Sequence, residues 1–187
     1  MEDEDNSIDA VLPMMDETLF KGYSEEALLS FGREYFEKDD LITSFMAFQE
    51  LYKSGGEHSS TGYISYGLVG SLELLSNYRL YRKALDRRNR KGYGSSILTE
   101  SSRRHETVLN FLPFMASHFM DLSSNLHATG NMSFDDLSLI EKIADRVSEE
   151  VNEEGLEGRE ILNRKYMEFK EEILENYLSE NRSGYDE

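Results

Sequence analysis

The sequence has no cysteine, only two prolines and no long apolar run among its 187 residues. The lack of cysteine excludes disulfides, thiol catalysis and the common structural zinc sites. The first residues, Met1 to Asp5, are acidic rather than apolar, which argues against a secretory signal. No stretch reaches the about 18 continuous apolar residues of a membrane span. We therefore expect a soluble, cytoplasmic protein with no membrane partner.

Signals for β-strands are also missing. There are no alternating runs of valine and isoleucine and no Asn-Gly hairpin, and the prolines stand only at Pro13 and Pro113. Apolar residues make up 39% of the chain and 13 glycines add to them, as in ordinary globular domains. We expect an all-α protein, a single bundle of about six helices over residues 24–178. Residues 1–12 are expected to be a flexible acidic tail, and residues 179–187 a flexible acidic C-terminus.

Capping residues and glycines indicate where the helices begin and end. Pro113 falls inside a helical pattern, so we expect a kink there or a break with a new helix start. Gly92 to Ser96 is expected to be a loop. The expected helix starts are Ser24, Asp39 or Asp40, Ser60 or Thr61, Ser101 or Ser102, Ser133 and about Arg159. The expected helix ends are about Lys38, Gly55, Lys91, Thr129, Asn152 and Leu178. The second helix is expected to bury Leu41, Phe45, Phe48 and Tyr52.

The net charge of −17 is unevenly distributed along the chain. Residues 135–187 contain 17 acids and 7 bases, a net charge of −10. Residues 79–104 contain nine bases against Asp86 and Glu100, a net charge of +7. These nine bases form the basic block: Arg79, Arg82, Lys83, Arg87, Arg88, Arg90, Lys91, Arg103 and Arg104.

Three tyrosines, Tyr78, Tyr81 and Tyr93, are interleaved with the basic block. Cations that neutralise phosphates, beside rings that stack on bases, are typical of single-stranded nucleic-acid binding. The basic block is therefore a candidate site for single-stranded RNA or DNA. The alternative is a solvated helix end or an internal docking site for the acidic C-terminal region or tail. A net charge of −17 also weakens long-range attraction to nucleic acid.

Two segments are almost empty of charge. Residues 58–78 contain only Glu73 and residues 107–134 contain only Asp121, although 30% of the chain is charged. We expect these segments to be buried on most sides, where an ionised acid must be paired, hydrogen-bonded or metal-bound. His118 lies about one helical turn from Asp121. Glu73, Asp121 and His118 are therefore candidate ligands of Mg²⁺, with Glu73 and Asp121 as candidate catalytic residues of RNA hydrolysis. The alternative is that each acid pairs with an arginine or lies at the bundle edge.

The order of several short motifs resembles the translin and translin-associated factor X superfamily. The motifs are Phe36 to Asp40 at a first hairpin turn, Gly62-Tyr63-Ile64 at the start of a long helix, Gly130-Asn131 before an amphipathic helix, and Leu162 to Lys165 opening the last helix. The resemblance spans about residues 24–178. It implies a helical protein that binds single-stranded RNA and DNA.

Catalytic members of that superfamily carry two acids three apart on the long helix and two acids four apart on a later helix. On this pattern the first pair falls on Gly70 and Glu73, and the second pair falls on Ser117 and Asp121. Half of the acids are therefore replaced. The resemblance implies nucleic-acid binding with ribonuclease activity lost or reduced, and a Mg²⁺-dependent ribonuclease remains the alternative.

A competing resemblance is to a tetratricopeptide-like helical hairpin. Gly32, Tyr35 and Phe48 stand at offsets that this repeat favours, with Ser44 where a small residue is needed. No second copy follows at the period of about 34 residues. The alternative function, from a different class, is a helical protein-interaction module whose polarised surface drives partner docking or self-association into a homo-oligomer.

Overall fold

The computed structural model describes residues 19–90 and 107–183, with the side chains of residues 88–90 and 180–183 left out. This described part is helical and contains no strand, which confirms the expected all-α bundle of about six helices. The helices are α1 (Glu25–Glu37), α2 (Leu41–Ser54), α3 (Ser59–Arg90), α5 (Leu112–Ala128), α6 (Phe134–Glu154) and α7 (Arg159–Ser183). Residues 107–110 form a further helical turn before α5.

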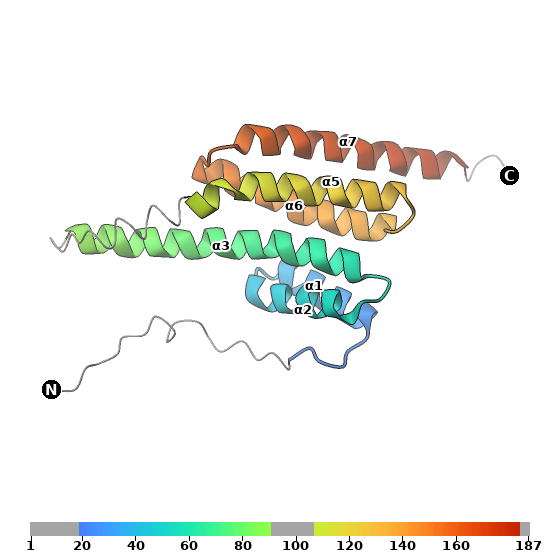
Figure 1. Cartoon of the computed structure of the whole chain (residues 1–187), viewed down its shortest axis with the longest axis horizontal. Coiled ribbons are helices and arrows are strands. Elements are labelled where there is room, and N and C mark those ends of the chain that lie inside the picture. Colours follow the sequence, from blue (N-terminus) through green and yellow to red (C-terminus); the bar gives the residue numbers. More distant parts are fainter. Residues whose placement is uncertain (1–18, 91–106, 184–187) are drawn as a thin grey trace.

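The long helix α3 runs through the middle of the molecule (Figure 1). The short hairpin of α1 and α2 lies on one side of it, and α2 makes the contact with α3. On the other side, α3 packs against α5 and α6, and α7 covers these two helices. The core is continuous through these layers, because α3 contributes buried side chains along most of its length, including Ile64, Leu68 and Leu75.

Most helix ends lie where local hydrogen-bond chemistry places them. The Ser24 hydroxyl accepts a hydrogen bond from the Ala27 amide, and the Asp40 carboxylate accepts one from the Thr43 amide at 3.1 Å. Asp39 takes the left-handed conformation that a tight turn requires (φ 63°), which leaves the capping role to Asp40. Gly55 ends α2 with a φ of 69°. α7 continues to Ser183, beyond the end expected at Leu178.

Pro113 marks a new helix start and not a kink. α5 begins at Leu112, and Pro113 occupies the first turn, where its missing N–H leaves no intrahelical hydrogen bond unmade. The predicted start near Ser101 or Ser102, the loop from Gly92 to Ser96, and the tail over residues 1–12 lie outside the described residues.

The α1–α2 hairpin is closely packed at the small residues of the tetratricopeptide-like pattern. Gly32 lies directly against the Phe48 ring, where a Cβ atom would collide with it. The Ser44 hydroxyl donates a hydrogen bond of 2.8 Å to the Gly32 carbonyl oxygen. Both contacts are buried, so the spacing of these residues fits the close approach of two helices.

The second helix differs from the prediction at two of four positions, since Phe45 is only partly buried and Tyr52 is exposed. Tyr52, which was expected in the core, is 46% exposed, whereas Leu41 and Phe48 are buried. The reason is geometric, because Tyr52 follows the buried Leu51 and faces the edge of the α2–α3 contact. Among the described residues, no helix is long and apolar enough to cross a membrane.

Candidate interaction surface

The prediction that Asp121 is buried is wrong. Its side chain is 51% exposed and forms an ion pair of 2.8 Å with Lys165 on α7. The segment is poor in charge because several of its exposed positions are apolar, and this does not imply burial on all sides. Phe111, Phe114 and Met115 are all at least 45% exposed. The alternative of a paired acid at the bundle edge describes Asp121, with a lysine in place of the arginine.

Glu73 is half-buried on α3 and lines a polar cavity of about 340 Å³ between the α1–α2 turn, α3 and α6. Its carboxylate accepts a hydrogen bond of 3.1 Å from Asn77. Two arginines also line the cavity: Arg146, which pairs with Asp39, and Arg79. The guanidinium of Arg146 also lies over the Phe36 ring, 5.7 Å from its centre.

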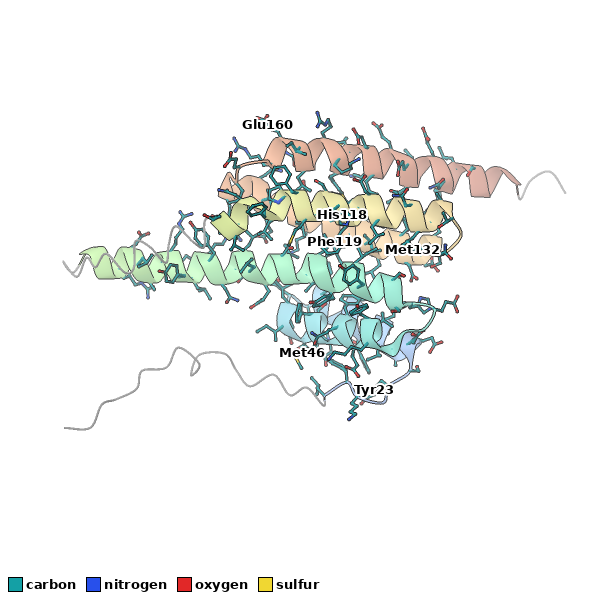
Figure 2. The ribbon with its side chains drawn as sticks, in the orientation of Figure 1. Tyr23, Met46, His118, Phe119, Met132 and Glu160 are labelled. Atoms are coloured by element: carbon teal, nitrogen blue, oxygen red, sulfur yellow. The ribbon has the colours of Figure 1, made fainter. Side chains whose placement is uncertain are left out.

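The structure does not gather the predicted metal ligands. Glu73 faces the cavity beside α6, and Asp121 faces Lys165 on α7. His118 is exposed on α5 (Figure 2). In residues 19–90 and 107–183 no three histidine, aspartate or glutamate side chains form a group that could hold a metal ion. The catalytic roles of Glu73 and Asp121 stay predictions, and no metal-binding group among the described residues supports them.

Part of the basic block is neutralised inside the molecule. Arg79 is ion-paired to three carboxylates at the end of α6, those of Glu150, Glu153 and Glu154. Arg82 pairs with Glu154 at 3.1 Å. Burial lowers the pKa of the Arg79 guanidinium, but its hydrogen bonds to Glu154 and Glu150 outweigh that effect and raise the pKa, so Arg79 stays charged. Arg79 and Arg82 therefore follow the alternative stated for the basic block, since they bind carboxylates of the acidic C-terminal region.

The rest of the basic block divides into exposed and undescribed residues. Lys83 and Arg87 are exposed, and no ion pair involves either of them within the described part of the chain. The side chains of Arg88 and Arg90, and the whole of Lys91, Tyr93, Arg103 and Arg104, lie outside the described residues.

Tyr78 differs from the prediction. It is only 6% exposed, and its ring packs under the Arg82 guanidinium at 5.7 Å, so its faces are not free for stacking on bases. Of the three tyrosines assigned to base stacking, Tyr78 is therefore occupied within the fold.

A row of aromatic rings crosses the outside of α2, α3 and α5, and the charge-based reading missed it. We call it the aromatic surface; it consists of Phe45, Tyr52, Tyr63, Tyr66 and Phe119. Consecutive ring centres are 4.8 Å apart from Phe45 to Tyr66, 6.5 Å from Tyr66 to Tyr52, 5.2 Å from Tyr52 to Tyr63, and 5.6 Å from Tyr63 to Phe119. The outermost rings are Tyr52, 46% exposed, and Tyr63, 39% exposed.

Glycines on α3 allow the rings of the neighbouring helices to lie against it. The Phe119 ring of α5 occupies the place that a Cβ atom at Gly67 would take. A Cβ atom at Gly70 would lie 3.0 Å from the Phe45 ring of α2. Gly70 is thus a packing position for Phe45, where the resemblance to translin would call for an acid. The spacing of Tyr63, Tyr66, Gly67 and Gly70 along one helix face is the sequence signal that could have revealed this surface.

A second feature that the sequence reading missed is a polar network around His58. Its Nδ1 lies 2.8 Å from a carboxylate oxygen of Asp136 on α6, and the Thr61 hydroxyl donates to the same oxygen at 3.0 Å. Asp136 is 4% exposed. The hydrogen bond to Asp136 raises the pKa of His58, against the opposing effect of burial. The network ties the start of α3 to the start of α6.

Comparison of the chain with protein-family models, with curated proteins and with solved structures finds no match. Among the described residues, the aromatic surface is the arrangement that brings the largest number of partly exposed rings together.

Proposed function

We propose that the protein is a helical protein-interaction module that binds a segment of a partner protein on its aromatic surface. The observation that supports this proposal is the row of partly exposed rings on three helices, two of them tyrosines more than a third exposed. Tyrosine is enriched in the centres of protein interfaces, because its ring offers a large apolar area with little conformational entropy to lose.

The charges around the rings favour a protein over a nucleic acid at this site. Single-stranded nucleic acids need a positive groove along the phosphates in addition to aromatic stacking. Residues 58–72 contain no formal charge. Lys53, which follows Tyr52, is paired with Glu50 at 3.7 Å. In the described part of the chain, no cation lies over any of the five rings.

The packing of the rings makes the surface pre-formed. Phe119 and Phe45 are held against glycines of α3, and Tyr52 and Tyr66 lie nearly parallel, 7° between ring planes. Rings fixed in this way lose little freedom when a partner binds, which is the main cost that a pre-organised site avoids. We expect Tyr63, between Tyr52 and Phe119, to contribute most to the binding free energy.

Site-specific photocrosslinking in the native host tests this proposal. A benzophenone amino acid replaces Tyr63 in one variant and the exposed Glu171 of α7 in a control variant. We expect a discrete protein adduct from position 63, absent from position 171, and lost when Tyr52→Ala is added. Equal adduct patterns at both positions, or an adduct at 63 that is insensitive to Tyr52→Ala, would contradict the proposal.

A second candidate function is single-stranded nucleic-acid binding at the basic block, supported by the exposed and unpaired Lys83 and Arg87 on α3, within the described residues. This function predicts salt-sensitive retention of a labelled single-stranded oligonucleotide. Retention should be lost in the double variant Arg87→Glu/Arg88→Glu and kept in Arg79→Gln, because Arg79 is already paired with α6. No retention at low salt would reject it.

A further inference from the structure

The aromatic surface has hydrogen-bond donors as well as ring faces. The hydroxyls of Tyr52, Tyr63 and Tyr66 make no hydrogen bond with any residue that the structure describes. Tyr63 and Tyr66 belong to residues 58–72, which contain no formal charge, whereas Tyr52 precedes Lys53, which is paired with Glu50. The surface therefore offers hydroxyl donors and apolar faces side by side, and its charged neighbours Lys53 and Asp121 are both ion-paired.

This combination suits a ligand with free carbonyl oxygens and flat apolar side chains. A polyproline II segment has both, because its backbone makes no internal hydrogen bonds and its proline rings are compact and apolar. Such segments are bound by aromatic-lined grooves in other folds, and they lose little conformational entropy on binding.

The ring distances set an upper limit on the span that this ligand can use. The two steps from Tyr52 to Tyr63 and from Tyr63 to Phe119 are 5.2 Å and 5.6 Å. The outer two rings are therefore at most about 11 Å apart, and every third residue of a polyproline II helix recurs after about 9 Å. One turn of the ligand is within that upper limit, with Tyr63 between the two outer rings.

Other kinds of peptide fit the surface less well. A strand added by main-chain pairing needs an exposed sheet edge, and the described part of the chain contains no strand. An amphipathic helix needs a groove that accepts aliphatic anchors at spacings of three and four residues. Here the places beside α3 where anchors would insert, at Gly67 and Gly70, are already filled by the rings of Phe119 and Phe45.

We propose that the partner segment bound by the aromatic surface is an uncharged, proline-rich segment in the polyproline II conformation, with Tyr63 as its central contact. This inference rests on the proposed function. Two tyrosine hydroxyls, those of Tyr52 and Tyr63, donate hydrogen bonds to carbonyl oxygens of the ligand, and the proline rings pack on the exposed faces.

A binding measurement with a defined peptide tests the inference. The probe is a fluorescein-labelled peptide of ten prolines, and its anisotropy is followed during titration with the full-length protein. We expect saturable binding that changes little with salt, and no binding of a labelled Gly-Ser peptide of equal length. Tyr63→Ala should weaken binding at least about tenfold, the loss typical of a central aromatic contact. Tyr63→Phe, which keeps the ring and removes the hydroxyl, should weaken it by a smaller factor.

Tyr23→Ala is the matched control. Tyr23 is 53% exposed but lies before α1, far from Phe119 in the view of Figure 2. We expect the affinity of the Tyr23→Ala variant for the proline peptide to remain within about twofold of that of the wild type. Surface changes away from a site have small effects. Circular dichroism of each variant checks that the helices are intact.

Three outcomes would overturn the inference: no binding of the proline peptide, equal binding by the Tyr63→Ala variant, or Tyr63-dependent binding of a labelled oligouridine in place of the peptide. If the crosslinked protein adduct at position 63 forms but the proline peptide does not bind, the choice of ligand fails and the interaction module stands. If both fail, the proposed function fails as well.

Discussion

The two halves of α3 are held in different ways. The first half, around Gly62 to Leu72, has no charge and is fixed by close packing against α2 and α5, with aromatic rings lying over its glycines. The second half is basic, and Arg79 and Arg82 attach it to the carboxylates at the end of α6. The same helix therefore presents the uncharged part of the aromatic surface at one end and a partly neutralised cationic segment at the other.

The two halves also differ in which of their exposed side chains have no partner within the described part of the chain. In the second half, the two described arginines nearest the bundle are paired within the chain, while Lys83 and Arg87 are exposed. In the first half, the rings are packed on one side and exposed on the other, with hydroxyls that make no hydrogen bond to the described residues. Four substitutions separate the contributions of packing, ion pairs and protonation.

Leu68→Ala should have the largest effect, because it removes close packing from the first half of α3. Leu68 is fully buried in the core. We expect the free energy of unfolding to fall by about 2–5 kcal/mol, from lost burial and the cavity left behind. Urea denaturation measures it, and a loss below about 1 kcal/mol would show that this half is not held by packing.

Arg79→Met should have the next largest effect, because it removes the ion pairs of the second half. Glu150 and Glu154, 21% and 11% exposed, would lose their main cationic partner. We expect a loss of about 1–3 kcal/mol, the cost of leaving a partly buried charged group without its hydrogen bond. Thermal unfolding of the wild type and the Arg79→Met variant in low and high salt measures the loss. An unchanged free energy of unfolding in low salt would mean that the observed pairs do not hold α3 to α6.

The contact between His58 and Asp136 should make stability depend on pH. A pKa that is raised in the folded state stabilises the fold below the unfolded pKa, and this contribution is lost as the pH rises through the folded value. We therefore expect the melting temperature to fall from about pH 6.5 upward, the ordinary pKa of histidine. Glu25 and Glu57 also favour the charged form of His58.

The matched control for this pH effect is His58→Gln, which keeps a hydrogen-bond donor but does not titrate. The difference in melting temperature between wild type and variant should shrink as the pH rises from 6 to 8. A difference that is constant over this range would show that protonation of His58 does not contribute to stability.

Asp121→Asn should have the smallest effect. Its ion pair with Lys165 is exposed, and exposed pairs contribute about 0.2–1 kcal/mol. We expect a change in the free energy of unfolding at the lower end of that range by urea denaturation. A loss above about 2 kcal/mol would mean that Asp121 has a structural role beyond this pair.

Local chemistry in the sequence was sufficient to predict the all-α class and most of the helix ends. Ser24, Asp40 and Ser133 cap helices through hydrogen bonds to amides three residues ahead, and such contacts can be read from short segments. At Pro113 the prediction left a kink and a new start open, and the structure has the new start. The resemblance to translin stays a prediction, and so does binding to nucleic acid.

The candidate site was harder to predict because it depends on contacts between distant segments. His58 and Asp136 are 78 residues apart and were not linked by any motif. The aromatic surface combines rings from three helices. Tyr63 and Tyr66 lie in a segment that was interpreted only by its lack of charge, and Tyr52 was predicted in the core. The same criterion predicted that the segment around Asp121 is buried on most sides, although apolar side chains can also stand on the surface.

The central claim, that the uncharged half of α3 is the recognition surface, is tested most directly by photocrosslinking from its two halves. The same benzophenone group replaces Tyr63 in one variant and the exposed Arg87 in the other. We expect a discrete protein adduct from position 63 and none from position 87. An adduct from position 87 alone, with protein or with nucleic acid, would contradict it.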